Sequence, residues 1–274
     1  MSIKSYLYKN RPEIAVASEY YGAYRDFRKA GFQKTPFGFL MAGQPAMQQG
    51  IYEPYETKRI MDCLRSSDVF IDIGANMGYY SCIARSMGLK VLAVEPLWHN
   101  LQYIYANLDI NHWSDVEIFP LGLSDRPGLA VLYGVGTAAS FIKDWAGIST
   151  KKRMVPLSTL DIIAAKRFSG SRLVIKIDVE GVEYKVLQGA AELLASTPGP
   201  VWIVETGLTG YFPGGVNQDY IKVFETFWSK GYTAYAMNED HEGEITKARV
   251  AQWIEKKDTE GQFNFLFRKA EEMK

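Results

Sequence analysis

A regular alternation of short apolar runs with segments of helical spacing constrains the fold of this chain more than any other feature. The runs are rich in β-branched residues, as in strands that are buried on both faces of a parallel sheet. We expect strands at 69–74, 90–95, 116–120, 173–178, 201–205, 232–237 and 263–268. Helices are expected at 53–64, 79–87, 98–108, 158–167, 183–194 and 220–230. The alternation predicts an α/β fold, in which a doubly wound, Rossmann-like and mostly parallel sheet carries helices on both faces. No helix of similar quality is expected between the last two strands, so the last strand can enter antiparallel.

The first expected strand leads into its helix through a glycine-rich turn. Residues 69–78 read VFIDIGANMG. Such a turn is expected to place bare backbone N–H groups and a helix N-terminus beside whatever lies above the sheet. The spacing Gly-x-x-x-Gly lacks the closely spaced glycines of a dinucleotide fingerprint and the Gly-Lys-Ser/Thr of a phosphate-binding loop. The remaining pattern is that of a site for S-adenosylmethionine (SAM), whose amino-acid part lies on the turn. The residues expected to contact it are Asp72, Gly74, Ala75, Asn76, Gly78 and Tyr79.

The ends of the next two strands supply candidates for the nucleoside of SAM. Glu95 ends the second strand, where a carboxylate can accept two hydrogen bonds from a ribose diol, and Pro96 stops the strand there. Leu123 and Ser124 follow the third strand, where adenine would lie. Asp125 is equally well explained as part of a plain turn.

Three carboxylates at the ends of the fourth and fifth strands are candidates for catalysis: Asp178, Glu180 and Glu205. A hydroxyl acceptor must lose its proton, which calls for a base or a metal. Asp178 has three possible roles: general base, ligand of the SAM amino group, or Mg²⁺ ligand together with Glu205. The Mg²⁺ site lacks a third ligand and is not favoured, so we assign no metal residues. Lys176, on the same strand face, would keep Asp178 ionised. His241 could serve as a base, but its acidic surroundings favour a solvated loop residue.

Several blocks of the sequence together resemble the FkbM-type SAM-dependent methyltransferases. The blocks are DIGANMG at 72–78, EP at 95–96, LSD at 123–125, STLD at 158–161, KIDVEG at 176–181 with Glu183, and LQG at 187–189. The resemblance extends over residues 35–237. It implies the class I methyltransferase fold, with seven strands of which the last is antiparallel. It also implies that SAM is consumed to S-adenosylhomocysteine (SAH) while a hydroxyl of a sugar, a glycan or a natural product is methylated.

The composition narrows the remaining function classes. The 274 residues include 31 basic and 31 acidic ones, so no net positive charge attracts nucleic acid. No apolar run is long enough for a membrane helix, no signal peptide is visible, and Cys63 and Cys82 are expected to be reduced, which predicts a cytoplasmic protein. A homo-oligomer is compatible with the sequence. A Rossmann-type NAD(P)-dependent oxidoreductase and a non-catalytic SAM-binding protein are the alternative functions.

The acceptor side is expected to be built by segments that cover the carboxyl edge of the sheet. Three segments qualify, at 44–56, 136–152 and 206–219, and the third is rich in glycine as a mobile lid would be. Trp145 and Tyr211 could stack on a sugar, although a core or surface role is the simpler interpretation of each. We expect residues 1–64 to form an extension that packs on a methyltransferase domain at 65–274.

Overall fold

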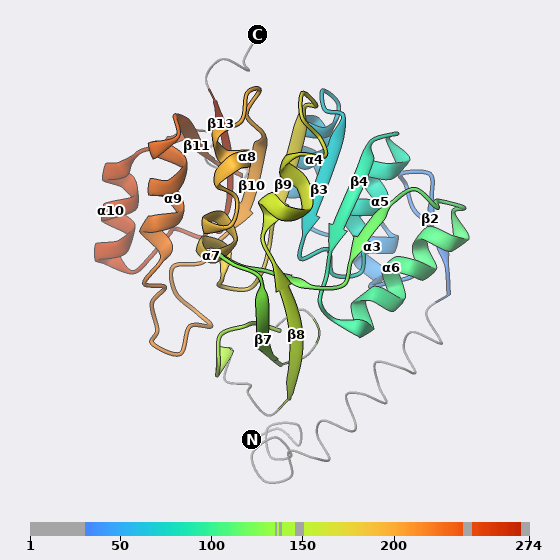
Figure 1. Ribbon diagram of the computed structural model, residues 1–274, viewed down its shortest axis with the longest axis horizontal. Helices are drawn as coiled ribbons and strands as arrows, with labels where there is room; N and C mark the ends of the chain where they lie inside the picture. The colour runs from blue at the N-terminus through green and yellow to red at the C-terminus, as the bar shows by residue number, and fades with distance from the viewer. Residues whose placement is uncertain (1–30, 135, 137–138, 146–150, 238–242, 270–274) are drawn as a thin grey trace.

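The computed structural model describes residues 31–269, except for 135, 137–138, 146–150 and 238–242. His241 lies outside the described residues. A large sheet forms the centre of the protein, with the strand order β12-β11-β13-β10-β9-β3-β4-β5 (Figure 1). Its strands are β3 (Val69–Ile73), β4 (Lys90–Val94), β5 (Glu117–Phe119), β9 (Leu173–Ile177), β10 (Val201–Glu205), β11 (Tyr232–Ala236), β12 (Glu244–Ile245) and β13 (Asn264–Lys269).

The strand order confirms the expected fold class. Strands β5, β4, β3, β9 and β10 are parallel, and β13 is antiparallel to both β10 and β11. The order reverses between β3 and β9, because the chain runs outward from β3 to β5 on one side and from β9 to β10 on the other. All seven expected strands are present, and the short edge strand β12 makes an eighth.

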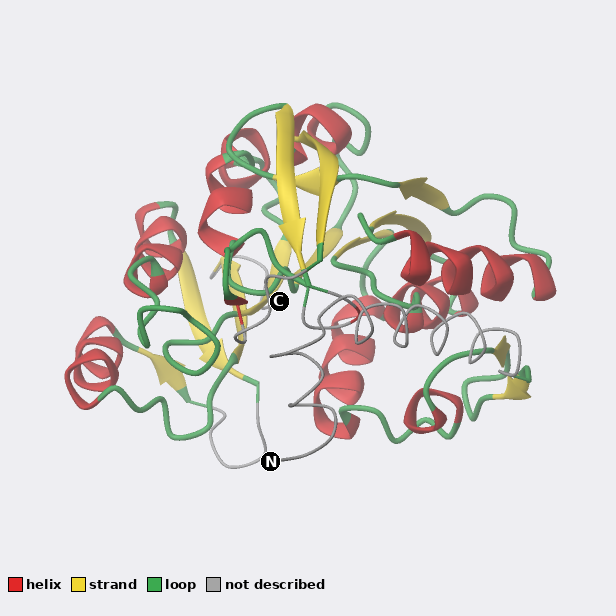
Figure 2. Cartoon of the chain, turned by 90° about the horizontal axis from the view of Figure 1, so that it is seen from below, coloured by secondary structure: helices red, strands yellow, loops and turns green. Residues whose placement is uncertain are grey.

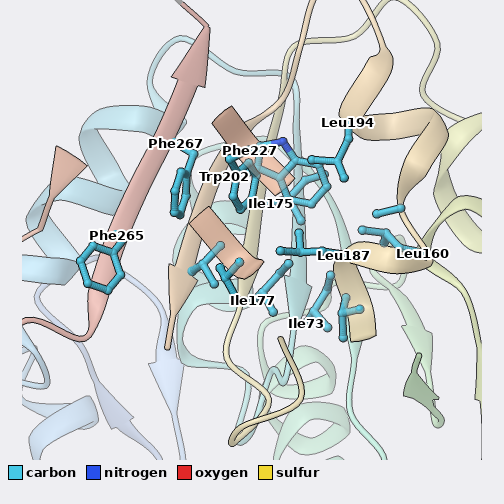
Figure 3. Packing of buried hydrophobic residues seen from close by; sticks show 14 of the residues in the cluster. Ile73, Leu160, Ile175, Ile177, Leu187, Leu194, Trp202, Phe227, Phe265 and Phe267 are labelled. Atoms are coloured by element: carbon cyan, nitrogen blue, oxygen red, sulfur yellow. The ribbon is translucent and has the colours of Figure 1, made fainter. Parts of the chain in front are cut away.

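Helices cover both faces of the sheet (Figure 1). One face carries α4 (Pro54–Leu64), α5 (Tyr79–Ser86) and α6 (Trp98–Ile110), and the other carries α7 (Glu183–Gln188), α8 (Ala191–Ala195), α9 (Tyr220–Ser229) and α10 (Lys247–Lys256). Because side chains alternate along a strand, Val69 and Ile71 of β3 enter one core while Phe70 enters the other. Figure 3 shows aliphatic and aromatic side chains packed together in the first core. In this core Phe227 stacks on Phe267 with 3.9 Å between ring centroids.

Three local expectations were wrong. The expected helix at 183–194 is broken into α7 and α8 at Gly189, where a Cβ would lie 2.2 Å from the Ser124 carbonyl oxygen. The expected helix at 158–167 is reduced to a π-helical turn, Asp161–Ala165. Helix α10 was not expected at all, although Thr246 caps it by accepting a hydrogen bond from the Arg249 N–H at 3.2 Å.

A small sheet extends beyond the carboxyl ends of the parallel strands (Figures 1 and 2). It consists of β6 (Gly122–Leu123), β7 (Gly128–Tyr133) and β8 (Lys152–Ser158), with β8 in the middle. The seven-residue strand β8 is not among the expected strands and lies almost entirely between the expected loop at 136–152 and the expected helix at 158–167. The ribbon of β7 and β8 stands over the edge of the main sheet at which parallel strands place their ligands.

The segment before β3 packs on the face that carries α5 and α6. It contains β1 (Gln33–Lys34), β2 (Leu40–Met41), α3 (Pro45–Gln48) and α4. Two asparagines hold it. Asn107 of α6 bonds the backbone N–H and C=O of Ala42, and Asn111, the C-cap of α6, bonds those of Leu40. The division into an extension at 1–64 and a domain at 65–274 stays a prediction. In the part of the chain that the structure describes, no helix has the length and apolar character needed to span a membrane.

Candidate active site

An open pocket with about 820 Å³ of empty space lies at the carboxyl edge of the sheet, where the strand order reverses. The ends of β3, β4, β9 and β10 and the turn after β5 all contribute to its walls. Eight of the residues expected in a SAM or catalytic site line it: Gly74, Asn76, Glu95, Pro96, Leu123, Asp178, Glu180 and Glu205.

The other five expected residues support the pocket from behind or lie beside it. Asp72 is 1% exposed and accepts a hydrogen bond from Ser81 Oγ at 2.6 Å. Burial raises the pKa of its carboxyl group. Ala75 and Tyr79 belong to the core under α5, Gly78 caps that helix with φ +82°, and Ser124 bonds to Asp125. The expected direct contacts of these five residues with SAM stay predictions.

The glycine turn differs from expectation in how its amides are used. The N–H groups of Gly74 and Ala75 bond to Val94 O at 2.9 and 3.1 Å, and that of Gly78 bonds to Ala75 O at 2.8 Å. The Asn76 N–H bonds to Glu95 Oε2 at 2.9 Å. These four amides are therefore not bare. The turn is tied to the end of β4, so the two parts of the pocket that were expected to hold SAM form one unit.

Glu95 is the residue that joins the glycine turn to the end of β4. Its side chain also accepts a hydrogen bond from the Leu97 N–H at 2.8 Å and interacts with the side chain of Asn100. Burial raises the pKa of Glu95 to about 7, although these hydrogen bonds oppose the shift. Each carboxylate oxygen can accept more than one hydrogen bond, so Glu95 keeps acceptor capacity toward the pocket.

Two unpaired oxygens in the pocket wall test whether a nucleoside cofactor fits. The Oδ1 atoms of Asn76 and Asn100 are buried, and neither has a hydrogen-bond partner in the structure. Both residues line the pocket beside Glu95. Buried acceptors without partners are costly, and a ligand with hydroxyl or amino groups would satisfy them. These acceptors therefore fit the ribose or the amino group of SAM.

An ion pair lies where β9 ends at the pocket. Lys176 Nζ lies 2.7 Å from Asp178 Oδ2, and the lysine side chain is only 4% exposed. Burial lowers the pKa of Lys176, but the charges of Asp178, Glu205 and Asp72 outweigh it and raise the pKa above its ordinary value. Lys176 thus stays charged and forms an ion pair with Asp178. The expectation that it keeps Asp178 ionised stays a prediction.

Two further carboxyl groups stand around this ion pair. The charge of Asp178, followed by burial, raises the pKa of Glu205 to about 9. Burial, followed by the charge of Asp178, raises the pKa of Glu180 to about 8. Both shifts favour the protonated form at neutral pH, so each carboxyl group exchanges its proton in the neutral to mildly alkaline range. Within the described residues, no group of three or more His, Cys, Asp or Glu side chains is arranged to hold a metal ion.

Sequence reasoning missed several lining residues. Tyr52 and Glu53 reach the pocket from the segment before α4, where Glu53 Oε2 accepts a hydrogen bond from Tyr80 OH at 2.7 Å. Phe141 lines the pocket from the segment after β7, against Gly122, where a Cβ would lie 2.5 Å from its ring. The only signal for these residues is their location in segments expected to cover the sheet edge.

Comparison with known proteins adds family information to this geometry. The family model of the methyltransferase FkbM domain matches residues 72–234. Similar solved structures include an O-methyltransferase from Bacillus cereus in complex with SAH, which is 12% identical with a TM-score of 0.43 over 78% of this chain and 79% of that one. They also include the O-methyltransferase TomG from Streptomyces achromogenes, which is involved in tomaymycin synthesis and was solved in complex with SAM. TomG is 12% identical, with a TM-score of 0.45 over 83% of this chain and 90% of that one. Precorrin-6y C5,15-methyltransferase from Geobacter metallireducens is 14% identical, with a TM-score of 0.42 over 85% of this chain and 94% of that one. No curated protein matches the chain.

Proposed function

The chain belongs to the FkbM methyltransferase family, and we propose that it is a SAM-dependent O-methyltransferase that acts on a hydroxyl of a sugar, a glycan or a natural product. One observation carries the proposal. A single pocket joins the glycine turn and Glu95 to the carboxylates of Asp178, Glu180 and Glu205. The first group suits a nucleoside cofactor, and the second suits an acceptor that must lose a proton.

At the cofactor end, Glu95 would accept hydrogen bonds from the ribose diol. The free Oδ1 atoms of Asn76 and Asn100 would accept bonds from other hydroxyl or amino donors of the ligand. SAM supplies a methyl group on a positively charged sulfonium, so the chemical step is an in-line displacement with a good leaving group. The protein contributes mainly by aligning the two reactants and excluding water.

At the acceptor end, we propose that one of the three carboxylates takes the proton of the acceptor hydroxyl. A general base works best when its pKa lies near the working pH, and the pKa values of Glu180 and Glu205, about 8 and 9, are in that range. Asp178, paired with Lys176, would orient the acceptor hydroxyl, bind the SAM amino group or act as the base itself. An Mg²⁺ ion at Asp178 and Glu205 stays the less favoured alternative.

The same proposal covers partners and location. The acceptor would be a small molecule or a glycan and not a nucleic acid, because the chain has 31 basic and 31 acidic residues and hence no net positive charge. We place the protein in the cytoplasm on the expectation that Cys63 and Cys82 are reduced.

The first experiment separates this function from the oxidoreductase alternative. We expect SAM and SAH to raise the melting temperature of the protein and NAD(P) to leave it unchanged, because only a ligand of the native state stabilises it. Transfer of a labelled methyl group is then measured from SAM to a panel of methyl glycosides and polyhydroxylated natural products. Stabilisation by NAD(P) but not by SAM would overturn the proposal.

A binding experiment tests the cofactor end by itself. Glu95→Gln should weaken SAM binding by about 1.5–3 kcal/mol in calorimetry, the scale of a hydrogen bond to a charged group. Glu117→Gln is the matched control, because Glu117 pairs with Arg167 on the surface. Equal SAM affinity in the wild type and Glu95→Gln would place the nucleoside elsewhere.

A further inference from the structure

The carboxyl group of Glu180 is held by a segment outside the main sheet, residues 140–145. Trp145 Nε1 donates a hydrogen bond to Glu180 Oε2 at 3.2 Å. Ser140 Oγ donates another to the Glu180 backbone oxygen at 2.6 Å. One short segment thus fixes both the side chain and the main chain of a carboxylate in the pocket wall.

The backbone around Glu180 is shaped to meet this segment. Glu180 has φ 55°, a left-handed conformation that is unfavourable for a residue with a side chain. Gly181 follows with φ +96°, and a Cβ there would lie 2.6 Å from the Trp145 ring and 2.9 Å from Ile142. Only glycine allows the loop after β9 to lie this close to the indole.

The indole of Trp145 also contacts the expected lid. The ring centroid of Phe212 lies 4.7 Å from that of Trp145 in an edge-on arrangement, and that of Tyr211 lies 5.8 Å away. Trp145 is only 5% exposed, whereas Tyr211 is 61% exposed. The 206–219 loop and the Glu180 carboxylate therefore meet at one side chain.

From these contacts we infer that Trp145 is a positioning residue that fixes the Glu180 carboxylate at the acceptor end of the pocket and couples its position to the 206–219 loop. The inference rests on the proposed function, because Glu180 has a task only where an acceptor hydroxyl is methylated. It adds to that function a residue that acts through Glu180. A tryptophan that only filled space would contribute the packing of its ring. The positioning role also requires the indole N–H, which donates the hydrogen bond to Glu180.

The contact itself is tested without turnover. In protein labelled with ¹⁵N at the tryptophan indoles, the Trp145 N–H resonance is assigned by its loss in Trp145→Phe. We expect Glu180→Ala and Phe212→Ala each to shift this resonance. The Trp228 resonance should not move, because Trp228 packs on Phe224 and Lys247 and serves as the internal control. A Trp145 resonance that is unchanged in both variants would overturn the inference.

The positioning role is tested by turnover with methyl glycosides at saturating SAM. Trp145→Phe should lower kcat by about ten- to a hundred-fold, the scale of a hydrogen bond to a charged group, and leave the Kd for SAM unchanged. The double variant Trp145→Phe/Glu180→Ala should be no slower than Glu180→Ala, because residues that act as a unit are not additive. Trp228→Phe should keep the wild-type rate. Additive losses, or a weaker SAM affinity in Trp145→Phe, would contradict the role. If no methyl glycoside is methylated, the sugar part of the proposed acceptor class is wrong, and the resonance shifts still decide whether Trp145 couples Glu180 to the loop.

Discussion

At the residue scale, position 74 requires a glycine for two separate reasons. From the sequence, a glycine was expected there because a ligand approaches the turn. In the structure, a Cβ at Gly74 would lie 1.8 Å from the backbone oxygen of Asp178. The ends of β3 and β9 therefore touch through this residue. The motif brings the cofactor end of the pocket directly against its acceptor end.

This contact predicts a loss of stability in Gly74→Ala. The variant has to accept φ +83° and also a clash with main-chain atoms that cannot move aside easily. Gly88→Ala is the matched control, because Gly88 has φ +89° but a Cβ added there would have nothing within 4 Å. We expect about 1 kcal/mol of destabilisation in the control, and clearly more in Gly74→Ala, by urea unfolding. Equal losses would show that the two strand ends are free to separate.

The three roles proposed for Asp178 predict three different results for Asp178→Asn. If Asp178 is the base, SAM should bind normally while the rate falls by about 10²–10⁴-fold. If it binds the SAM amino group, SAM affinity should fall, and the maximal rate should recover at high SAM concentration. If it ligates Mg²⁺, the wild-type enzyme should lose activity in EDTA and regain it with added Mg²⁺. Wild-type rate and affinity in the variant would remove Asp178 from the mechanism.

At the scale of elements, periodicity predicted what lies in the centre of the molecule. The strands buried on both faces carry continuous apolar runs, and helices such as α6 bury a regular face. The elements that it missed lie at the margin. Helix α10 buries only Val250 and Trp253, so its apolar stripe is narrow. Strand β8 exposes Met154 and Pro156, and its strand conformation depends on pairing with β7.

The candidate site likewise contains residues that could be predicted from the sequence and residues that could not. Glu95, Asp178 and Glu205 could be predicted because a parallel sheet brings the carboxyl ends of its strands to one edge. Glu53 and Phe141 could not, because they arrive on irregular segments whose path depends on tertiary contacts. For Glu53 this contact is the hydrogen bond from Tyr80, and for Phe141 it is the packing against Gly122.

The 206–219 loop is the element for which we predict the largest response to ligands. Its ends are tied down, with Thr206 N–H bonded to Phe263 O and Asn217 N–H bonded to Leu208 O. Between them, the loop is held by the local bond from Gly215 N–H to Phe212 O and by the contacts of Tyr211 and Phe212 with Trp145. Added Cβ atoms at Gly210, Gly214 and Gly215 would meet nothing. We expect the amides at 209–216 to exchange rapidly in the free protein and to gain protection with SAH and acceptor. The amides of α9, which follows the loop, serve as the control. Equal protection in the free and ternary states would contradict a lid.

At the scale of the whole molecule, the interior carries more acid than base. Among the described residues, the buried ionisable side chains of Asp, Glu, Lys and Arg are those of Asp72, Glu95, Glu183 and Lys176. Glu183 lies outside the pocket lining and braces the loop after β9, because it accepts hydrogen bonds from the Gly181 N–H at 2.7 Å and from Thr206 Oγ1 at 3.2 Å. A buried carboxyl group of this kind makes global stability depend on pH.

Burial raises the pKa of Glu183 from the ordinary 4.5 to about 7, so the folded state holds the proton more tightly than the unfolded state. Its contribution to stability is therefore complete below about pH 4.5 and is lost as the pH rises through about 7. Glu183→Gln keeps the shape and removes the titration. The free energy of unfolding of the wild type minus that of Glu183→Gln should thus fall by on the order of 2–3 kcal/mol between pH 5 and pH 8. Urea unfolding at each pH measures this difference, with Glu192→Gln on the exposed side of α8 as the matched control. A constant difference across the range would mean that Glu183 stays ionised in the fold, stabilised by its two hydrogen bonds.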